Sequence, residues 1–122
     1  AVAQRMAAHE VAAYPEALGL EAGSAAVEHR VLQPSSLFWA AAVYGQLNVA
    51  FALRGCAVVT EAVDARELAA VACRERVTVL GLAPSLLALL EPADLGAERG
   101  GSCSLQRLIA WGEACPPSVA QR

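Results

Sequence analysis

Lysine is absent from this sequence of 122 residues, and all nine of its lysine or arginine positions hold arginine. A reaction that needs a lysine must therefore obtain it from outside these residues. The formal net charge is -3 at pH 7. Because nucleic-acid binding depends on clustered basic side chains that meet phosphates, this charge excludes a nucleic-acid partner.

Metal-ligand and redox spacings are missing too. Cys56, Cys73, Cys103 and Cys115 form no Cys-x-x-Cys pair, which excludes zinc-ligand spacing and a thioredoxin-type motif. We therefore expect no metal site and buried, reduced thiols. No basic segment followed by a short apolar core opens the sequence, so no signal peptide is expected and the expected compartment is the cytoplasm.

Charged residues are scarce, at 17% against 57% hydrophobic residues, whereas an ordinary soluble domain has roughly 45–50% apolar residues. This composition predicts exposed apolar surface, and hence a partner or a homo-oligomer. No charge occurs from Val31 to Leu53, a length that could cross a bilayer. Gln33, Pro34 and Asn48 interrupt this run, so we expect a buried strand and a buried helix there, with no membrane contact.

The hydrophobic pattern predicts strands that alternate with helices. A first helix over 2–18 is expected to end at Pro15 or Gly19, and Pro34 stops the first strand. The segment 37–53 is apolar almost all round, which predicts one helix buried on most of its circumference and closed by Gly55. The β-branched run at 56–60 predicts a strand covered on both faces.

The second half continues the alternation. Asp64 and Glu67 form a helix start signal, with the apolar face of that helix following up to about Arg76. Further strands are expected at 77–82 and 105–111, a helix from Pro84 that ends before Pro92, and a last helix opened by the prolines at 116 and 117.

This order predicts an α/β fold in three layers, with a mostly parallel sheet of about four strands and helices on both faces. We expect one domain over 1–122, in which a leading helix and loop (1–30) precede the alternating core (31–122).

Several short segments, read in order, resemble the adenylation domains of nonribosomal peptide synthetases. They are Arg30–Gln33, Leu53–Gly55, Val77–Ser85 and Ser104–Pro116. The resemblance implies a truncated part of the N-terminal subdomain of an adenylate-forming enzyme. In that family a carboxylic acid is activated with ATP and magnesium to an acyl-adenylate and then passed to a carrier-protein thiol. Neighbouring synthetase domains or a carrier protein are the implied partners.

The same resemblance implies positions for a binding site. Gly112, Glu113 and Ala114 match the turn that lies against adenine, although a plain strand-to-helix turn would also need Gly112 for its backbone angles. Pocket-lining positions match Ala42, Val43, Gln46, Gly81, Ile109 and Trp111. Small residues are more usual at the last position, so Trp111 indicates a small substrate, a closed pocket, or an aromatic core anchor with a hydrogen-bonded indole.

Two departures limit the expected chemistry. Ala42 stands where the family usually has an aspartate that pairs with the substrate α-ammonium, and no acidic residue occurs between Arg30 and Glu61. An unpaired buried ammonium would cost several kcal/mol, which argues against ordinary amino acids. The family's phosphate-binding loop and its lysine are also missing, so we expect no catalytic residue and no bound cofactor for these residues alone.

The remaining reactive side chains have ordinary explanations. His9 and His29 belong to no recognisable catalytic motif and are expected to be solvent-exposed. Cys115 is expected to be a small apolar filler, and Glu113 has no second carboxylate near it for two-acid catalysis.

Three functions stay open at this point. The chain could be an inactive adenylation-like segment with a structural or docking role. It could also be the core of a working adenylating enzyme that flanking sequence completes, with an acid that lacks an α-amine as substrate. The third alternative is a small α/β interaction module unrelated to acyl activation.

Overall fold

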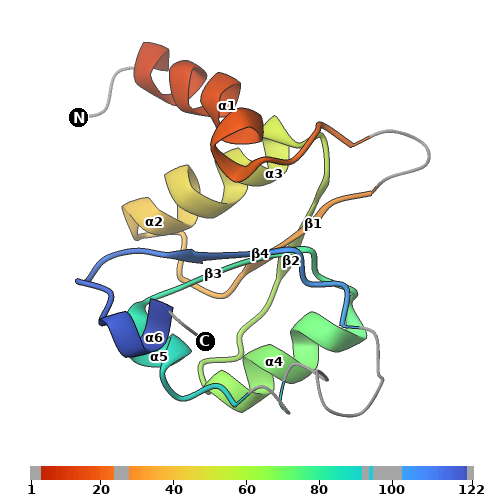
Figure 1. The fold of residues 1–122 in the computed structure, drawn as a ribbon. Helices are drawn as coiled ribbons and strands as arrows, with labels where there is room; N and C mark the ends of the chain where they lie inside the picture. Colours follow the sequence, from red (N-terminus) through yellow and green to blue (C-terminus); the bar gives the residue numbers. More distant parts are fainter. Residues whose placement is uncertain (1–3, 24–27, 92–93, 95–102, 121–122) are drawn as a thin grey trace.

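The computed structural model describes residues 4–23, 28–91, 94 and 103–120. These residues form a sheet in which every strand pairing is parallel, in the order β2-β1-β3-β4 (Figure 1). The strands are β1 (Arg30–Gln33), β2 (Cys56–Val59), β3 (Val79–Leu82) and β4 (Arg107–Ala110). The parallel α/β sheet predicted from the sequence is therefore confirmed.

Helices cover both faces of this sheet, which confirms the three layers (Figure 1). On one face lie α1 (Gln4–Leu18), α2 (Ala40–Ala42), the π-helical segment η1 (Val43–Leu47) and α3 (Asn48–Ala52). On the other face lie α4 (Ala65–Arg74), α5 (Pro84–Leu87) and α6 (Pro117–Ala120).

The two central strands supply both halves of the core. Because successive side chains of a strand point to opposite faces, alternate residues of β1 and β3 enter different layers. Val31 and Val79 pack with α3 on one face, and Leu32 and Leu80 pack with α4 on the other. The burial of both faces explains why β3 is a continuous apolar run and why Val31 and Leu32 of β1 are adjacent apolar residues.

The ends of the helices follow from specific backbone hydrogen bonds. The carboxylate of Asp64 accepts from the backbone N–H groups of Arg66 and Glu67 at 2.9 and 3.2 Å, which caps the start of α4 as predicted. Of the two predicted ends of α1, Gly19 is correct, since the helix passes through Pro15 and Gly19 has a φ of +59°.

The prediction of one α-helix over 37–53 is wrong in two respects. The helix begins only at Ala40, and the large apolar side chains at 37–39 before it are exposed, Phe38 to 90%. Its middle turns are π-helical, with the backbone N–H of Asn48 donating to the carbonyl of Val43. A π segment accommodates an additional residue in the helix and re-aims the side chains beside it.

The prediction for Gly55 is also corrected. The left-handed residue that ends α3 is Arg54, with a φ of 50°, and the N–H of Gly55 donates to the carbonyl of Ala50 at 2.9 Å. This is the hydrogen-bond pattern of a Schellman motif, displaced by one residue from the glycine. Glycine is required at 55 for a different reason, because a Cβ there would overlap the carbonyl oxygen of His29.

Two apolar segments were predicted more regular or more buried than they are. β2 is an edge strand of the described sheet, and Val59 is 72% exposed, so this strand is not covered on both faces. The helix that begins at Pro84 ends at Leu87, and Leu90 is buried outside it. An apolar run in the sequence does not show whether a strand has a partner on both sides. It also does not show where a short helix ends.

His29 is a further correction, since only 3% of it is exposed. Its Nε2–H donates to the carbonyl of Glu21 at 2.8 Å. His9 is exposed as predicted. Among the cysteines, Cys115 is exposed and the other three are half-buried free thiols, so full burial of all four is wrong.

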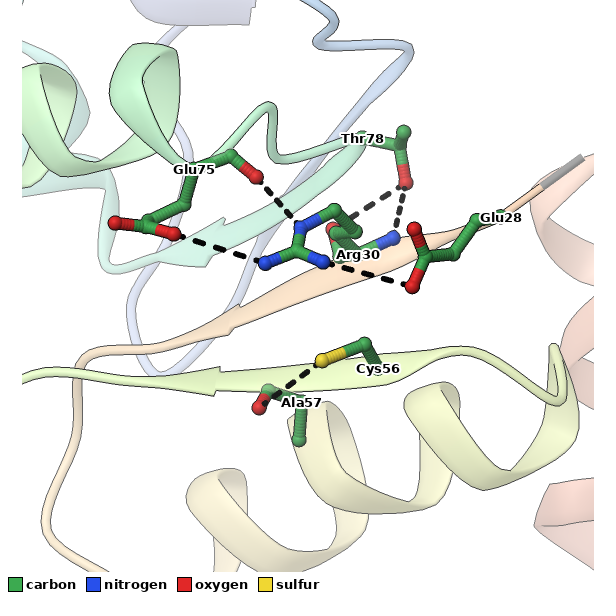
Figure 2. Close-up of polar contacts among 6 residues, drawn as sticks. All are labelled: Glu28, Arg30, Cys56, Ala57, Glu75 and Thr78. Carbon is green, nitrogen blue, oxygen red and sulfur yellow. Dashed lines mark hydrogen bonds and ion pairs between the residues drawn. The ribbon is translucent and has the colours of Figure 1, made fainter.

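Arg30 joins β1 to the end of α4 at the amino ends of the strands (Figure 2). Its Nε–H donates to the carbonyl of Glu75 at 2.6 Å, and its guanidinium lies 3.6 Å from the Glu75 carboxylate and 3.5 Å from that of Glu28. The backbone N–H of Arg30 donates to Thr78 Oγ1 at 2.9 Å. The first of these bonds gives a partner to the carbonyl of Glu75 at the end of α4, where carbonyl groups lack intrahelical partners.

Within the described part of the chain, every helix is too short or too polar to cross a bilayer. The uncharged run 31–53 forms β1 and the helical segment after it.

Replacement of Asp64 by alanine removes the cap of α4, and we expect it to lower the free energy of unfolding by about 1 kcal/mol. Urea denaturation of the 122-residue chain measures this loss. Glu61→Ala is the control, because Glu61 is an exposed acid outside any helix and should change stability by less than about 0.5 kcal/mol. Equal losses in the two variants would contradict the capping role.

Candidate functional site

A hollow of about 420 Å³ lies at the carboxyl ends of the four strands. Segments that follow each strand contribute to it, together with the starts of the helices. Its lining residues are Pro34, Ser35, Trp39, Ala40, Ala41, Ala62, Val63, Leu68, Leu82, Ala83, Leu86, Trp111 and Gly112. Ligands of open parallel sheets bind at this edge, so the hollow is the candidate site.

The lining of the hollow is almost entirely apolar. None of the described residues that line it carries a charge, and the polar side-chain groups among them are the hydroxyl of Ser35 and the indole N–H groups of Trp39 and Trp111. Such a site can bury a hydrocarbon chain or a flat ring by the hydrophobic effect. It offers no cation for a carboxylate or a phosphate and no anion for an ammonium group.

Trp111 fills the space between the helical layer and β3. A Cβ placed on Gly45 would lie 2.6 Å from the Trp111 ring, and one placed on Gly81 would overlap the ring. The indole therefore packs directly on the backbone of both glycines, from η1 and from β3. Its N–H has no hydrogen-bond partner among the residues that the structure describes, so the hydrogen-bonded core anchor considered from the sequence is wrong in that detail.

Gln46 connects the same two elements. Its side chain is 1% exposed, and its Nε2–H donates to the carbonyl of Gly81 at 3.0 Å. Its Oε1 is buried and has no partner among the described residues. Gln46 therefore holds η1 against β3 directly beside Trp111, and it does not line the hollow.

A second hydrogen bond fixes η1 from the outside. The hydroxyl of Tyr14 donates to the carbonyl of Tyr44 at 2.6 Å. Burial, and to a smaller extent the charge of Glu10, raises the pKa of Tyr14, so its hydroxyl stays protonated and donates across the neutral pH range. Helix α1 thereby supports the segment on which Gly45 and Gln46 lie.

The turn after β4 lies at the rim of the hollow. Gly112 has a φ of +84°, and nothing lies within 4 Å of a Cβ built on it. The positive φ is the backbone requirement expected of a plain turn. The open space leaves room for a ligand against the backbone. The carboxylate of Glu113 accepts from Ser85 Oγ at 2.8 Å, which ties this turn to α5.

The structure brings only part of the predicted site together. Trp111 and Gly112 line the hollow, and Gly81 and Gln46 contact each other next to it. Ala42 is fully buried, and Ile109 packs against the core beside α3. The residues that line the hollow do not include Ala42, Val43, Ile109 or Ala114. The roles given to these residues remain predictions.

Sequence reasoning missed Gly45, Trp39 and Ser35. Trp39 and Ser35 could have been identified from the rule that ligands bind beyond the carboxyl ends of parallel strands, since both lie between β1 and the helix that follows it. Gly45 could not, because its role depends on the side chain of Trp111, which packs against it from just after β4, far along the chain.

ATP and magnesium fit this site only in part. The open backbone at Gly112 and the apolar lining suit a flat ring such as adenine. The lining contains no cation for a triphosphate and no carboxylate for a magnesium ion. The described residues therefore suit the adenine base of ATP, but they provide no charge to bind its phosphates.

Comparison with known families gives one match for nearly the whole chain. A family model described as AMP-binding enzyme matches residues 2–122. No protein of curated function matches the chain.

Solved structures match in fold. The crystal structure of the N-terminal domain of FACL13 from Mycobacterium tuberculosis in space group C2 is similar with a TM-score of 0.70 and 18% identity, over 94% of this chain and 28% of that chain. An inhibitor-bound crystal structure of the same domain gives a TM-score of 0.64 and 22% identity, over 94% and 27%. The chain thus spans just over a quarter of the length of these structures.

The contact between Trp111 and Gly81 predicts strong coupling between the two positions. Gly81→Ala should lower the free energy of unfolding by about 1–3 kcal/mol, because the added methyl group overlaps the indole ring. In a Trp111→Ala background the same substitution should cost almost nothing, since the ring is gone. Urea denaturation of the two single variants and the double variant measures this cycle. Equal costs of Gly81→Ala in both backgrounds would contradict the packing described here.

Proposed function

The chain belongs to the AMP-binding enzyme family, and we propose that it forms the acyl-binding and adenine-facing part of an enzyme that activates a carboxylic acid with ATP. The single observation that carries this proposal is the uncharged apolar hollow at the carboxyl ends of the strands, with the Gly112 turn at its rim. When ATP is bound, it supplies the adenylyl group. These residues hold the hydrocarbon part of the acid and the flat face of the base.

The proposed substrate is a small apolar acid without an α-ammonium group. Trp111 occupies the space between Gly45 and Gly81, so only the outer hollow is left for the acyl group. No acidic side chain among the described residues lines that hollow, and Ala42 stands where the family's amino-acid-activating members usually have aspartate. An ammonium group would lose its hydration there without gaining a counter-charge.

The proposed segment does not complete the reaction by itself. Transfer of an adenylyl group requires positioned cations around the phosphates. The chain contains no lysine, and no arginine lines the hollow among the described residues. We propose that residues outside these 122 supply the charges, consistent with a match to just over a quarter of the similar structures.

We propose a nonribosomal peptide synthetase as the larger context, with neighbouring domains or a carrier protein as partners. The support is the order of the sequence segments that resemble adenylation domains, above all Val77–Ser85 and Ser104–Pro116. Two roles remain candidates: an inactive segment that serves structure or docking, and the core of a working enzyme completed by flanking sequence. The alternative of an interaction module unrelated to acyl activation is contradicted by the family match.

Both tryptophans of the chain line the hollow, so tryptophan fluorescence reports its occupation. We expect hexanoic acid to change the emission in a saturable way. Norleucine, which is hexanoic acid with an α-amino group, should bind at least about tenfold more weakly, a difference of about 1.4 kcal/mol. Titration of the 122-residue chain with each compound measures the two affinities.

Variants that retain one tryptophan assign this fluorescence signal. Trp39→Phe leaves Trp111 as the reporter, and Trp111→Phe leaves Trp39. Each variant should show a saturable change in emission with hexanoic acid if one hollow is being filled. Tighter binding of norleucine than of hexanoic acid would overturn the proposed substrate class.

ATP–pyrophosphate exchange tests the proposed division of the reaction. The 122-residue chain should show no exchange above background with hexanoic acid, because its hollow holds no phosphate-binding cation. Exchange by this chain alone would refute the claim that outside residues are required. Exchange by a longer protein that contains the chain, and its loss on Gly112→Val, would favour the working enzyme over the inactive segment.

A further inference from the structure

The thiols of Cys73 and Cys103 are in direct contact. Their sulfur atoms lie 2.9 Å apart although the residues are separated by 30 positions in the sequence. Cys73 lies in the last turn of α4, and Cys103 lies in the segment that leads into β4. This separation is less than about 1 Å longer than an S–S bond, which places the two sulfurs within reach of one another.

The pair can be reached from solvent, since both residues are half-buried. Its two sulfurs differ from the other thiols of the described residues. The thiol of Cys56 lies 3.7 Å from the carbonyl of Ala57, and that of Cys115 lies 3.8 Å from the carbonyl of Pro116. Each of these contacts is to the adjacent residue, and neither sulfur has another sulfur as its partner there.

We propose that Cys73 and Cys103 are an oxidative modification site, at which a hydroperoxide converts the two thiols into a disulfide between α4 and the segment before β4. This inference does not depend on the proposed function. The cysteine pair lies near the amino ends of the strands, whereas the hollow lies at their carboxyl ends.

The chemistry uses the hydrogen bond between the two thiols. The S–H of Cys73 donates to the sulfur of Cys103 at 2.9 Å, and the carbonyl of Asp94 lies farther from the Cys73 sulfur, at 3.9 Å. After the proton of the Cys103 thiol has passed to solvent, its sulfur attacks one oxygen of the hydroperoxide and the O–O bond breaks. Hydroxide or alkoxide leaves with the electron pair and takes up a proton from solvent, and Cys103 becomes a sulfenic acid. The sulfur of Cys73 then attacks that sulfur and displaces hydroxide, which takes the Cys73 proton and leaves as water.

The thiol of Cys73 is protonated in the resting state of the pair. Burial, followed by the hydrogen bond and the charge of Cys103, raises the pKa of Cys73 to about 11. Cys73 is therefore protonated at neutral pH and acts as the second thiol, after Cys103 has been oxidised.

The position of the pair predicts what the disulfide changes. Four positions after Cys103, β4 begins, and the backbone N–H groups of Gln106 and Arg107 both donate to the carbonyl of Thr78 at 2.8 and 3.0 Å. The cross-link therefore fixes α4 to the amino ends of β3 and β4. The hollow lies at the carboxyl ends of the same strands, so its shape should not change.

The sequence makes a direct test available. Because every basic residue is arginine, trypsin places each cysteine in a different peptide, namely 55–66, 67–74, 100–107 and 108–122. The native chain is treated with a slight molar excess of hydrogen peroxide, its remaining thiols are alkylated, and the peptides are identified by mass spectrometry without reduction. We expect peptides 67–74 and 100–107 to be linked, with a mass lower by two hydrogen atoms, in at least about tenfold excess over any other pair.

Matched variants and an unfolded sample provide the controls. Cys73→Ser and Cys103→Ser should abolish the link, whereas Cys56→Ser and Cys115→Ser should leave it unchanged. Oxidation in guanidinium chloride should give a mixture of pairings, because folding no longer selects one. The native disulfide should raise the midpoint of thermal unfolding by roughly 10 °C, since it closes a long loop in the unfolded chain.

Three outcomes would overturn the proposal. The first is a native sample in which other pairs form as readily as Cys73 with Cys103. The second is oxidation of Cys103 to sulfinic acid while Cys73 remains a free thiol. The third is a linked product with an unchanged unfolding midpoint and altered binding of hexanoic acid in the fluorescence titration.

Discussion

The burial of both faces of β1 and β3 is the constraint on which the rest of this fold depends. Val31, Leu32, Val79 and Leu80 are each at most 1% exposed, and alternate side chains point into different layers. Two separate apolar clusters must therefore be completed by helices, one by α1 and α3 and the other by α4 and α5. Parallel pairing follows, because each strand reaches the next through a helix that crosses one face.

The candidate site is a consequence of that arrangement. The carboxyl ends of the strands meet at one edge, and the segments that leave them diverge to opposite faces, which opens the hollow. Trp111 then limits its depth, since the indole lies on Gly45 and Gly81. A large rigid side chain at this position needs glycine on both neighbouring elements, and the hydrogen bond from Gln46 to Gly81 keeps those elements in place.

The surface of the chain has apolar side chains that its own core does not use. Phe38, Val63 and Phe51 are largely exposed, and β2 and β4 are both edges of the described sheet. Exposed apolar surface of this kind was expected from the composition. The chain spans just over a quarter of the length of the structures it resembles.

The sequence by itself determined the α/β class, the alternation of strands with helices and the cap at Asp64. These features depend on local pattern, namely apolar runs and a capping spacing. Only the tertiary structure decided that β2 is an edge, that His29 is buried, that η1 is π-helical and that Cys73 touches Cys103. The edge position of β2, the burial of His29 and the contact of Cys73 with Cys103 depend on contacts between separate segments, and periodicity along a sequence carries no information about which segments will meet. The π-helical turns of η1 are a local hydrogen-bond pattern that an apolar run does not distinguish from an α-helix.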